Sequence, residues 1–144
     1  APMDLGDKDA NVLGSDRVEL FFRSANLEHD YVALEIDSKG RNFDSKNQFY
    51  HPVIKSWDYS LQDIDIATSI SQKGYIVEGR ISLQSLEELG LLENNELITG
   101  LYRGEYVLSP QGKVDVSWIS WIDVPSTNPD FHIPCSFGKL ILGD

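Results

Sequence analysis

Strict alternation between apolar and polar residues, repeated in short segments separated by turn residues, is the feature that most restricts the fold of this chain. Residues 17–23 read RVELFFR, which places Val18, Leu20 and Phe22 on one side of an extended chain. Residues 30–37 read DYVALEID and alternate in the same way. A helix would scatter these residues around its axis, so a period of two predicts strands that each bury one face.

The alternation recurs at hairpin spacing along the rest of the sequence. We expect further strands at residues 63–71, 75–82, 97–107, 113–121 and 137–142. Residues 43–60 have weak periodicity and predict one short strand with an irregular connection. A single helix is expected after Ser82, which can cap its start, and Gly90 can end it. The pattern predicts an all-β fold, an antiparallel β-sandwich of the jelly-roll or immunoglobulin-like kind with one short helix.

The charge balance excludes some partners. The chain carries 23 Asp and Glu against 12 Lys and Arg, a formal net charge of −11. A nucleic-acid backbone or an anionic membrane surface would be repelled, so neither is an expected partner. No apolar run approaches the roughly 20 residues of a membrane span, so no membrane insertion is expected. The lone Cys135 cannot form an intrachain disulfide, and we expect it to be a small buried residue.

The polar leader contains a possible cation site. Asp4, Asp7 and Asp9 lie close enough in sequence for their oxygens to bind calcium, although the spacing does not match the helical calcium loop. The other interpretation of this stretch is a solvated loop. Haem ligation is disfavoured, since the only methionine, Met3, lies in the leader and the three histidines are scattered.

The clearest candidate site lies near the C-terminus. Residues 124–130 form a loop that prolines exclude from regular pairing, and the segment around its end carries Asn128, Asp130, Phe131 and His132. An aromatic side chain beside hydrogen-bonding groups suits a polar ring-shaped ligand such as a sugar. Trp57 or Trp121 could add a second aromatic surface. We expect Trp118 in the core instead.

Five stretches of the sequence, taken in order, resemble the family-nine carbohydrate-binding modules and the wider group of modules like them. They are residues 16–22, 31–40, 74–86, 100–106 and 119–142. The resemblance implies a secreted, periplasmic or cell-surface β-sandwich without catalytic activity. It also implies a linked polysaccharide-degrading enzyme, such as a xylanase. The family pattern begins with hydrophobic strands that this chain does not show, so we expect a single domain over residues 1–144 that lacks its N-terminal strands.

The resemblance also implies site residues. The family holds a sugar between two aromatic walls, and its strand glutamate matches Glu19, its loop asparagine Asn128, and its second wall Phe131. Three positions depart from the pattern: the first wall falls on Leu13, and a strand arginine and asparagine fall on Glu35 and Asp37. A site with these departures could prefer a different sugar, need a cation, or bind nothing.

We therefore expect a sugar or oligosaccharide end to be bound by Glu19, Glu35, Asp37, Asn128 and Phe131, with His132 at the rim. One alternative is a structural or partner-binding sandwich of a secreted protein without sugar binding. Another is a glycoside hydrolase, which would need two carboxylates about 5–5.5 Å or about 6.5–9.5 Å apart. Arg103 is expected to form an ion pair with Glu105 or with Glu19, and the alternative is that this end of the strand faces the site.

Overall fold

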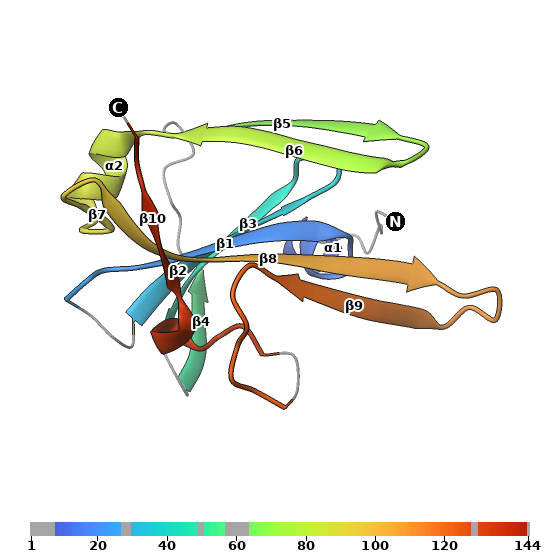
Figure 1. The fold of residues 1–144 in the computed structure, drawn as a ribbon. Coiled ribbons are helices and arrows are strands. Elements are labelled where there is room, and N and C mark those ends of the chain that lie inside the picture. The colour runs from blue at the N-terminus through green and yellow to red at the C-terminus, as the bar shows by residue number, and fades with distance from the viewer. Residues whose placement is uncertain (1–7, 27–29, 49–50, 57–63, 128–129, 144) are drawn as a thin grey trace.

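The computed structural model describes residues 8–26, 30–48, 51–56, 64–127 and 130–143. Antiparallel strands make up most of this part of the chain, accompanied by two short α-helices and a 3₁₀ helix. Figure 1 shows a large twisted sheet with a separate two-stranded hairpin along one side. The predicted all-β, antiparallel fold class is confirmed.

The large sheet contains eight of the described strands. Along its main path the order is β10-β8-β1-β2-β3-β4, and β7 and β9 also pair with β8. The strands are β1 (Arg17–Arg23), β2 (Asp30–Asp37), β3 (Asn42–Gln48), β4 (His51–Ser56), β7 (Leu92–Glu93), β8 (Glu96–Leu108), β9 (Val114–Ser120) and β10 (Gly138–Ile141).

Strand β8 determines where the C-terminal loop lies. One edge of β8 pairs with β1, and the other edge carries β10 at residues 96–99 and β9 at residues 102–108. β9 ends with Ser120 opposite Tyr102, whereas β10 begins with Gly138 opposite Thr99. The chain between β9 and β10 therefore leaves and re-enters the sheet at neighbouring positions of β8. This pairing holds the loop beside the middle of that strand.

Both faces of the large sheet carry buried apolar side chains. The cluster on the side of the hairpin contains Phe22, Val32, Leu86, Leu91, Leu92 and Leu97. The cluster on the opposite face contains Phe21, Tyr31, Ala33, Tyr102 and Phe137. Arg17 and Glu19 share this second face, which the alternation predicted to point outward, yet both are buried. That prediction is wrong because residues of the C-terminal loop and of the N-terminal helix cover the face.

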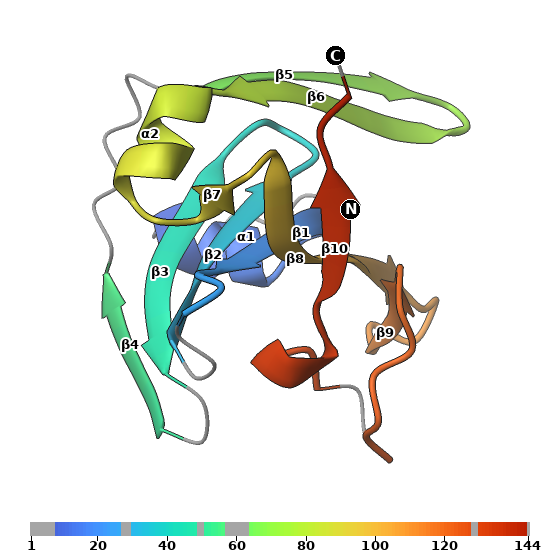
Figure 2. The same cartoon turned by 60° about the vertical axis from the view of Figure 1, so that its left-hand side comes forward.

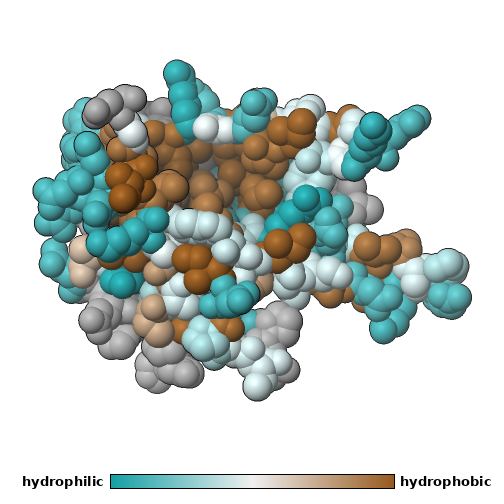
Figure 3. Space-filling model, viewed as in Figure 1, coloured by the Kyte–Doolittle hydropathy of each residue, from teal (hydrophilic) through white to brown (hydrophobic). Residues whose placement is uncertain are grey.

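The second layer is the hairpin of β5 (Ile64–Ser71) and β6 (Gly74–Ile81). It crosses one face of the large sheet in both ribbon views (Figures 1 and 2), which gives the two layers of a β-sandwich. Apolar side chains gather between the layers (Figure 3), and some stay exposed, including Ile70, Ile76 and Ile141. That the domain lacks N-terminal strands stays a prediction.

Of the three described helices, one was predicted from the sequence and two were not. α2 (Leu83–Glu88) begins as predicted, since the Ser82 side chain accepts a hydrogen bond from the Ser85 N–H. α1 (Lys8–Leu13) forms inside the stretch expected to be a loop. The 3₁₀ helix η2 (Pro134–Ser136) buries its proline and exposes Cys135, so the predicted burial of that cysteine is wrong.

The irregular stretch after β2 also differs from expectation, because it contains two strands, β3 and β4, in place of one. Their polar residues hid the alternation. Of the two partners considered for Arg103, Glu105 is the one it pairs with, at 2.7 Å between Nη2 and Oε1, and both side chains are partly exposed. No helix in the described part of the chain is long and apolar enough to cross a membrane.

Candidate functional site

A row of four buried side chains crosses the large sheet on the face opposite the hairpin. The register places Phe43 opposite Glu35, Glu35 opposite Glu19, and Glu19 opposite Tyr102. Directly opposed residues have Cβ atoms about 4.5–5.5 Å apart. The pairing of β1 with β2 therefore brings two glutamates together inside the protein.

Arg17 holds this pair of glutamates. Its Nε donates to Glu19 Oε1 at 2.8 Å and lies 2.6 Å from Glu35 Oε2. Its Nη1 donates to the Leu13 carbonyl oxygen at 2.7 Å and to the Tyr106 hydroxyl at 2.8 Å. Burying charges is tolerated where hydrogen bonds and opposite charges compensate them, and this network compensates the guanidinium well.

The glutamates are less well compensated than the arginine. Burial and the neighbouring Glu35 raise the pKa of Glu19 to about 7, although Arg17 acts in the opposite direction. Burial also raises the pKa of Glu35, again against the effect of Arg17. The single Nε hydrogen points to Glu19, so Glu35 Oε2 has an ion-pair contact with Arg17 Nε but no well-aligned hydrogen bond among the described residues. One arginine is therefore shared between two carboxylates and satisfies only one of them fully.

The C-terminal loop supplies an aromatic wall. Phe131 stacks on Tyr102 of β8, with ring centroids 4.2 Å apart and ring planes 8° apart. Trp118 of β9 meets Phe131 edge-on, at 5.4 Å and 81°. Trp118 also lies over the Arg17 guanidinium, 5.1 Å from Cζ, which is a cation–π contact. Two rings from the sheet thus hold Phe131 above the glutamates.

Gly100 allows the Tyr102 ring to take this position. The two residues are neighbours on the same face of β8, and a Cβ at Gly100 would collide with the ring and hydroxyl of Tyr102. A glycine inside a strand often marks such a close approach. The absent side chain therefore leaves room for the ring on which Phe131 rests.

His132 is anchored beside the wall. Its Nδ1 and the Tyr31 hydroxyl are 2.6 Å apart and share a hydrogen bond, and its ring packs 5.2 Å from that of Phe21. Its backbone N–H donates to Asp130 Oδ1 at 3.0 Å. This packing lowers the pKa of the imidazole, against the effect of Asp130, while the residue as a whole keeps contact with solvent. The uncharged form of the imidazole is therefore favoured.

These groups line a hollow of about 190 Å³ that opens to solvent. Its acidic lining is Glu19, Glu35 and Asp130, and its aromatic lining is Phe43, Trp118, Phe131 and His132. Leu13, Arg17, Ser45 and Asn47 complete the described lining. Four of the predicted site residues, Glu19, Glu35, Phe131 and His132, thus lie around one hollow, and Leu13 joins them.

Asp37, a further predicted site residue, does not line this hollow. Its Oδ1 accepts hydrogen bonds from the backbone N–H groups of Lys39 and Arg41, and its Oδ2 accepts one from Arg41 Nε at 2.6 Å. The carboxylate stabilises the β2–β3 turn, a role common for Asp at such positions. Asn128 lies outside the described residues, so its contact with a sugar stays a prediction.

The predicted calcium ligands are only partly described. Asp4 and Asp7 lie outside the described residues, and Asp9 lies in the first turn of α1. Among the residues that the structure describes, no group of three or more His, Cys, Asp and Glu side chains could hold a metal ion. A calcium site at these three aspartates stays a prediction.

Several lining residues were missed from the sequence. Arg17 has the strand parity of Glu19, which could have placed it in the site, and Trp118 was assigned to the core. Ser45 and Asn47 are buried, and Asn47 Nδ2 donates to Ser45 Oγ at 2.8 Å. Polar residues occupy both faces of β3, so no alternation marked these two. Trp121 is 48% exposed and is not part of the lining, and Trp57 lies outside the described residues.

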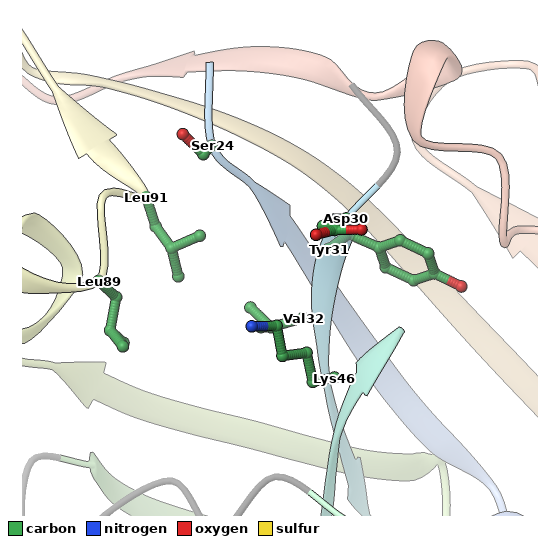
Figure 4. Close-up of a pocket in the computed structure, with 7 residues that line it drawn as sticks. All are labelled: Ser24, Asp30, Tyr31, Val32, Lys46, Leu89 and Leu91. Atoms are coloured by element: carbon green, nitrogen blue, oxygen red, sulfur yellow. The ribbon is translucent and has the colours of Figure 1, made fainter. Parts of the chain in front are cut away.

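A second, smaller hollow of about 110 Å³ lies on the other face of β2 (Figure 4). Leu89, Leu91 and Val32 face into it, whereas the ring of Tyr31 points away, towards the site described above. Its lining combines three aliphatic residues with Ser24, Asp30 and Lys46, and it lacks the stacked aromatic wall of the first hollow. It is therefore a weaker candidate for a polar ligand.

The fold is a β-sandwich with an aromatic, carboxylate-lined hollow on one face of its larger sheet. The chain belongs to the carbohydrate family 9 binding domain-like family, which it matches over residues 3–144. The predicted family resemblance is thereby confirmed. No curated protein matches the sequence.

The fold is similar to the crystal structure of a protein from Bacteroides uniformis ATCC 8492 to which carbohydrate binding has been ascribed. The TM-score is 0.63 and the sequences are 16% identical over 90% of this chain. The chain spans 62% of the length of that protein. At this identity the similarity shows the fold alone.

Proposed function

We propose that this chain is a non-catalytic carbohydrate-binding module that holds one sugar ring, at the end of a glycan, in the hollow beneath residues 130–132. The observation that carries the proposal is the meeting of the Phe131 and Trp118 rings with the buried carboxylates of Glu19 and Glu35. A sugar has an apolar C–H face and a polar rim, and it needs such a combination of groups. Membership of a carbohydrate-binding family supports the same assignment.

The size of the hollow supports a single ring. Its volume of about 190 Å³ lies below the roughly 300–1,000 Å³ of pockets for drug-sized ligands. In this proposal Phe131 packs on the ring, Glu19 and Glu35 accept hydrogen bonds from it, and His132 contacts it at the rim. Asn128 contributes a contact that the family resemblance implies.

The geometry argues against a glycoside hydrolase. Such enzymes place the scissile bond between two carboxylates that are free to act as acid and base or nucleophile. Here Arg17 Nε lies 2.8 Å from Glu19 Oε1 and 2.6 Å from Glu35 Oε2. The arginine therefore occupies the space that a glycosidic bond would need.

The second candidate is a structural or partner-binding sandwich without sugar binding. It is favoured by Leu13, which puts an aliphatic side chain where the resemblance implies an aromatic wall, and by the exposed apolar residues of the hairpin. In either case we propose that the domain is secreted, periplasmic or on the cell surface. For a sugar-binding module we add a linked polysaccharide-degrading enzyme.

The test is retention of the protein in gels that contain soluble polysaccharides, followed by a glycan array. We expect slowed migration in at least one glycan, and loss of the retardation in Phe131→Ala and Glu19→Ala variants that remain folded. Trp121→Ala removes an aromatic side chain outside the hollow and serves as the matched control. Equal retention of all four proteins would place the sugar elsewhere, and no retention on any glycan would favour the second candidate.

A further inference from the structure

The described lining of the hollow carries more negative than positive charge. Glu19, Glu35 and Asp130 contribute three carboxyl groups, of which Glu19 is only partly ionised near pH 7, and Arg17 is the one cation among the lining residues described. The remaining titratable group, His132, favours its uncharged form because packing lowers the pKa of its imidazole. Glu19 and Glu35 are 3% and 4% exposed, so water compensates their charge poorly.

Arg17 offsets this excess only in part, because it carries one positive charge and contacts both glutamates. Its Nε hydrogen is directed to Glu19, and its Nη1 serves the Leu13 carbonyl and the Tyr106 hydroxyl. Glu35 Oε2 is left buried at the hollow without a hydrogen bond from any described residue, even though Arg17 Nε lies 2.6 Å away. A buried carboxylate oxygen that shares its cation with a second carboxylate and lacks a well-aligned donor favours a ligand that brings both a donor and a positive charge.

We propose that the sugar in this hollow carries a free amino group, as a terminal hexosamine does, and that its ammonium binds Glu35 next to Glu19. The inference rests on the proposed function, because it needs a sugar in this hollow. An ammonium has three N–H donors and one positive charge, so it satisfies the oxygen and offsets the excess. A hydroxyl supplies the hydrogen bond alone, and a uronic acid or a sulfate adds to the excess.

The protonation of the pair is consistent with this preference. Burial and Glu35 raise the pKa of Glu19 to about 7 in spite of Arg17. A raised carboxyl pKa means that the surroundings stabilise an added proton, which is an added positive charge. An ammonium brings the same charge to the same pair of carboxylates.

Titration calorimetry with glucosamine, N-acetylglucosamine, glucose and glucuronic acid tests the proposal at pH 7, where an amine with a pKa of about 7.7–8.0 is mostly charged. At lower pH the Glu19 carboxyl, with its pKa of about 7, takes up a proton and the negative excess shrinks. A hydrogen bond to a charged group contributes about 1.5–3 kcal/mol, so glucosamine should bind at least about tenfold more tightly than glucose or N-acetylglucosamine. Glucuronic acid should bind most weakly.

Variants distinguish the amine from other causes. The Glu35→Gln variant keeps the shape of the side chain and removes its charge. In this variant the ratio of the affinity for glucosamine to that for glucose should fall towards one. In Glu87→Gln, which changes an exposed carboxylate on α2, the preference should persist. A melting curve checks that each variant is folded.

Equal binding of glucose and glucosamine, tighter binding of glucuronic acid, or a preference that disappears with a calcium chelator would each overturn the amine assignment. The proposed function would stand in all three cases, because a sugar is still bound. Failure of every mono- and polysaccharide to bind would overturn both proposals together.

Discussion

Phe131 and Tyr102 stack almost in parallel, with ring centroids 4.2 Å apart and planes 8° apart. One ring belongs to the loop between β9 and β10, and the other to the strand that pairs with both. The contact fixes the loop against the sheet face that carries the glutamates. The loop is thus part of the packed structure before any ligand arrives, which favours binding because little conformational entropy is lost.

Replacing Phe131 by Ala should abolish glycan retention and lower stability. Aromatic pairs contribute about 0.5–1.5 kcal/mol beyond the burial of their area, and Phe131 contacts two rings. Urea unfolding measures the stability change, and affinity electrophoresis measures retention. Trp121→Ala is the control for loss of an aromatic side chain. If Phe131→Ala were retained as strongly as the parent, the Phe131 ring would stabilise the fold without contributing to glycan binding.

Replacing Arg17 by Met should destabilise the fold by about 3–5 kcal/mol, because removing one partner of a buried ion pair leaves the other charge uncompensated. Here two glutamates lose their cation. Adding Glu19→Gln and Glu35→Gln to the same protein should restore much of the loss. Urea unfolding of the single and triple variants checks this. A loss below about 1 kcal/mol in Arg17→Met would mean that the glutamates find protons or water instead.

The stability of the protein should fall as the pH rises from about 4.5 to about 7 because of Glu19. The folded state binds the Glu19 proton more tightly than the unfolded chain does, so raising the pH through this window favours unfolding. Above the window the penalty is complete and constant.

The pH prediction is measured as the free energy of unfolding in urea across that range. Glu19→Gln should remove this part of the slope and should be more stable than the parent above the window. Glu87→Gln, an exposed carboxylate, should leave the slope unchanged. A Glu19→Gln protein with the parental slope would contradict the prediction.

Replacing Asp37 by Asn should destabilise the fold without reducing glycan retention. The carboxylate accepts hydrogen bonds from the N–H groups of Lys39 and Arg41 and pairs with the Arg41 side chain. Loss of partners for buried groups costs about 1–3 kcal/mol, which chemical unfolding measures. If retention disappeared while circular dichroism showed an intact fold, Asp37 would belong to the binding site after all.

Strand positions were predictable from the sequence wherever one residue in two is apolar. β1 and β2 have the expected bounds, and the hairpin of β5 and β6 turns where Gly74 allows it. β3 and its partner β4 were merged into one irregular segment, because the polar residues of β3 reflect burial under a polar site. Alternation marks strands that have one buried apolar face and one solvated polar face. It fails where polar side chains are buried in a site.

The site was predictable in part for the same reason. Parity placed Glu19 and Glu35 on one face, and loop chemistry singled out Phe131 and His132. Neither could show that Arg17 binds both carboxylates, since an arginine at a strand end is usually exposed. Nor could parity separate Asp37 from the other two, because the use of its oxygens by a turn depends on backbone geometry.

Gly100 contributes no atom to the lining of the hollow, yet the orientation of Tyr102 depends on its lack of a side chain. A comparison of related chains at ligand-contacting positions alone would therefore misjudge which of them keep the aromatic wall. A chain could keep every contact residue and lose the wall through one added methyl group. The smallest residue on the strand is a better marker of an intact wall than any of the charged groups beside it.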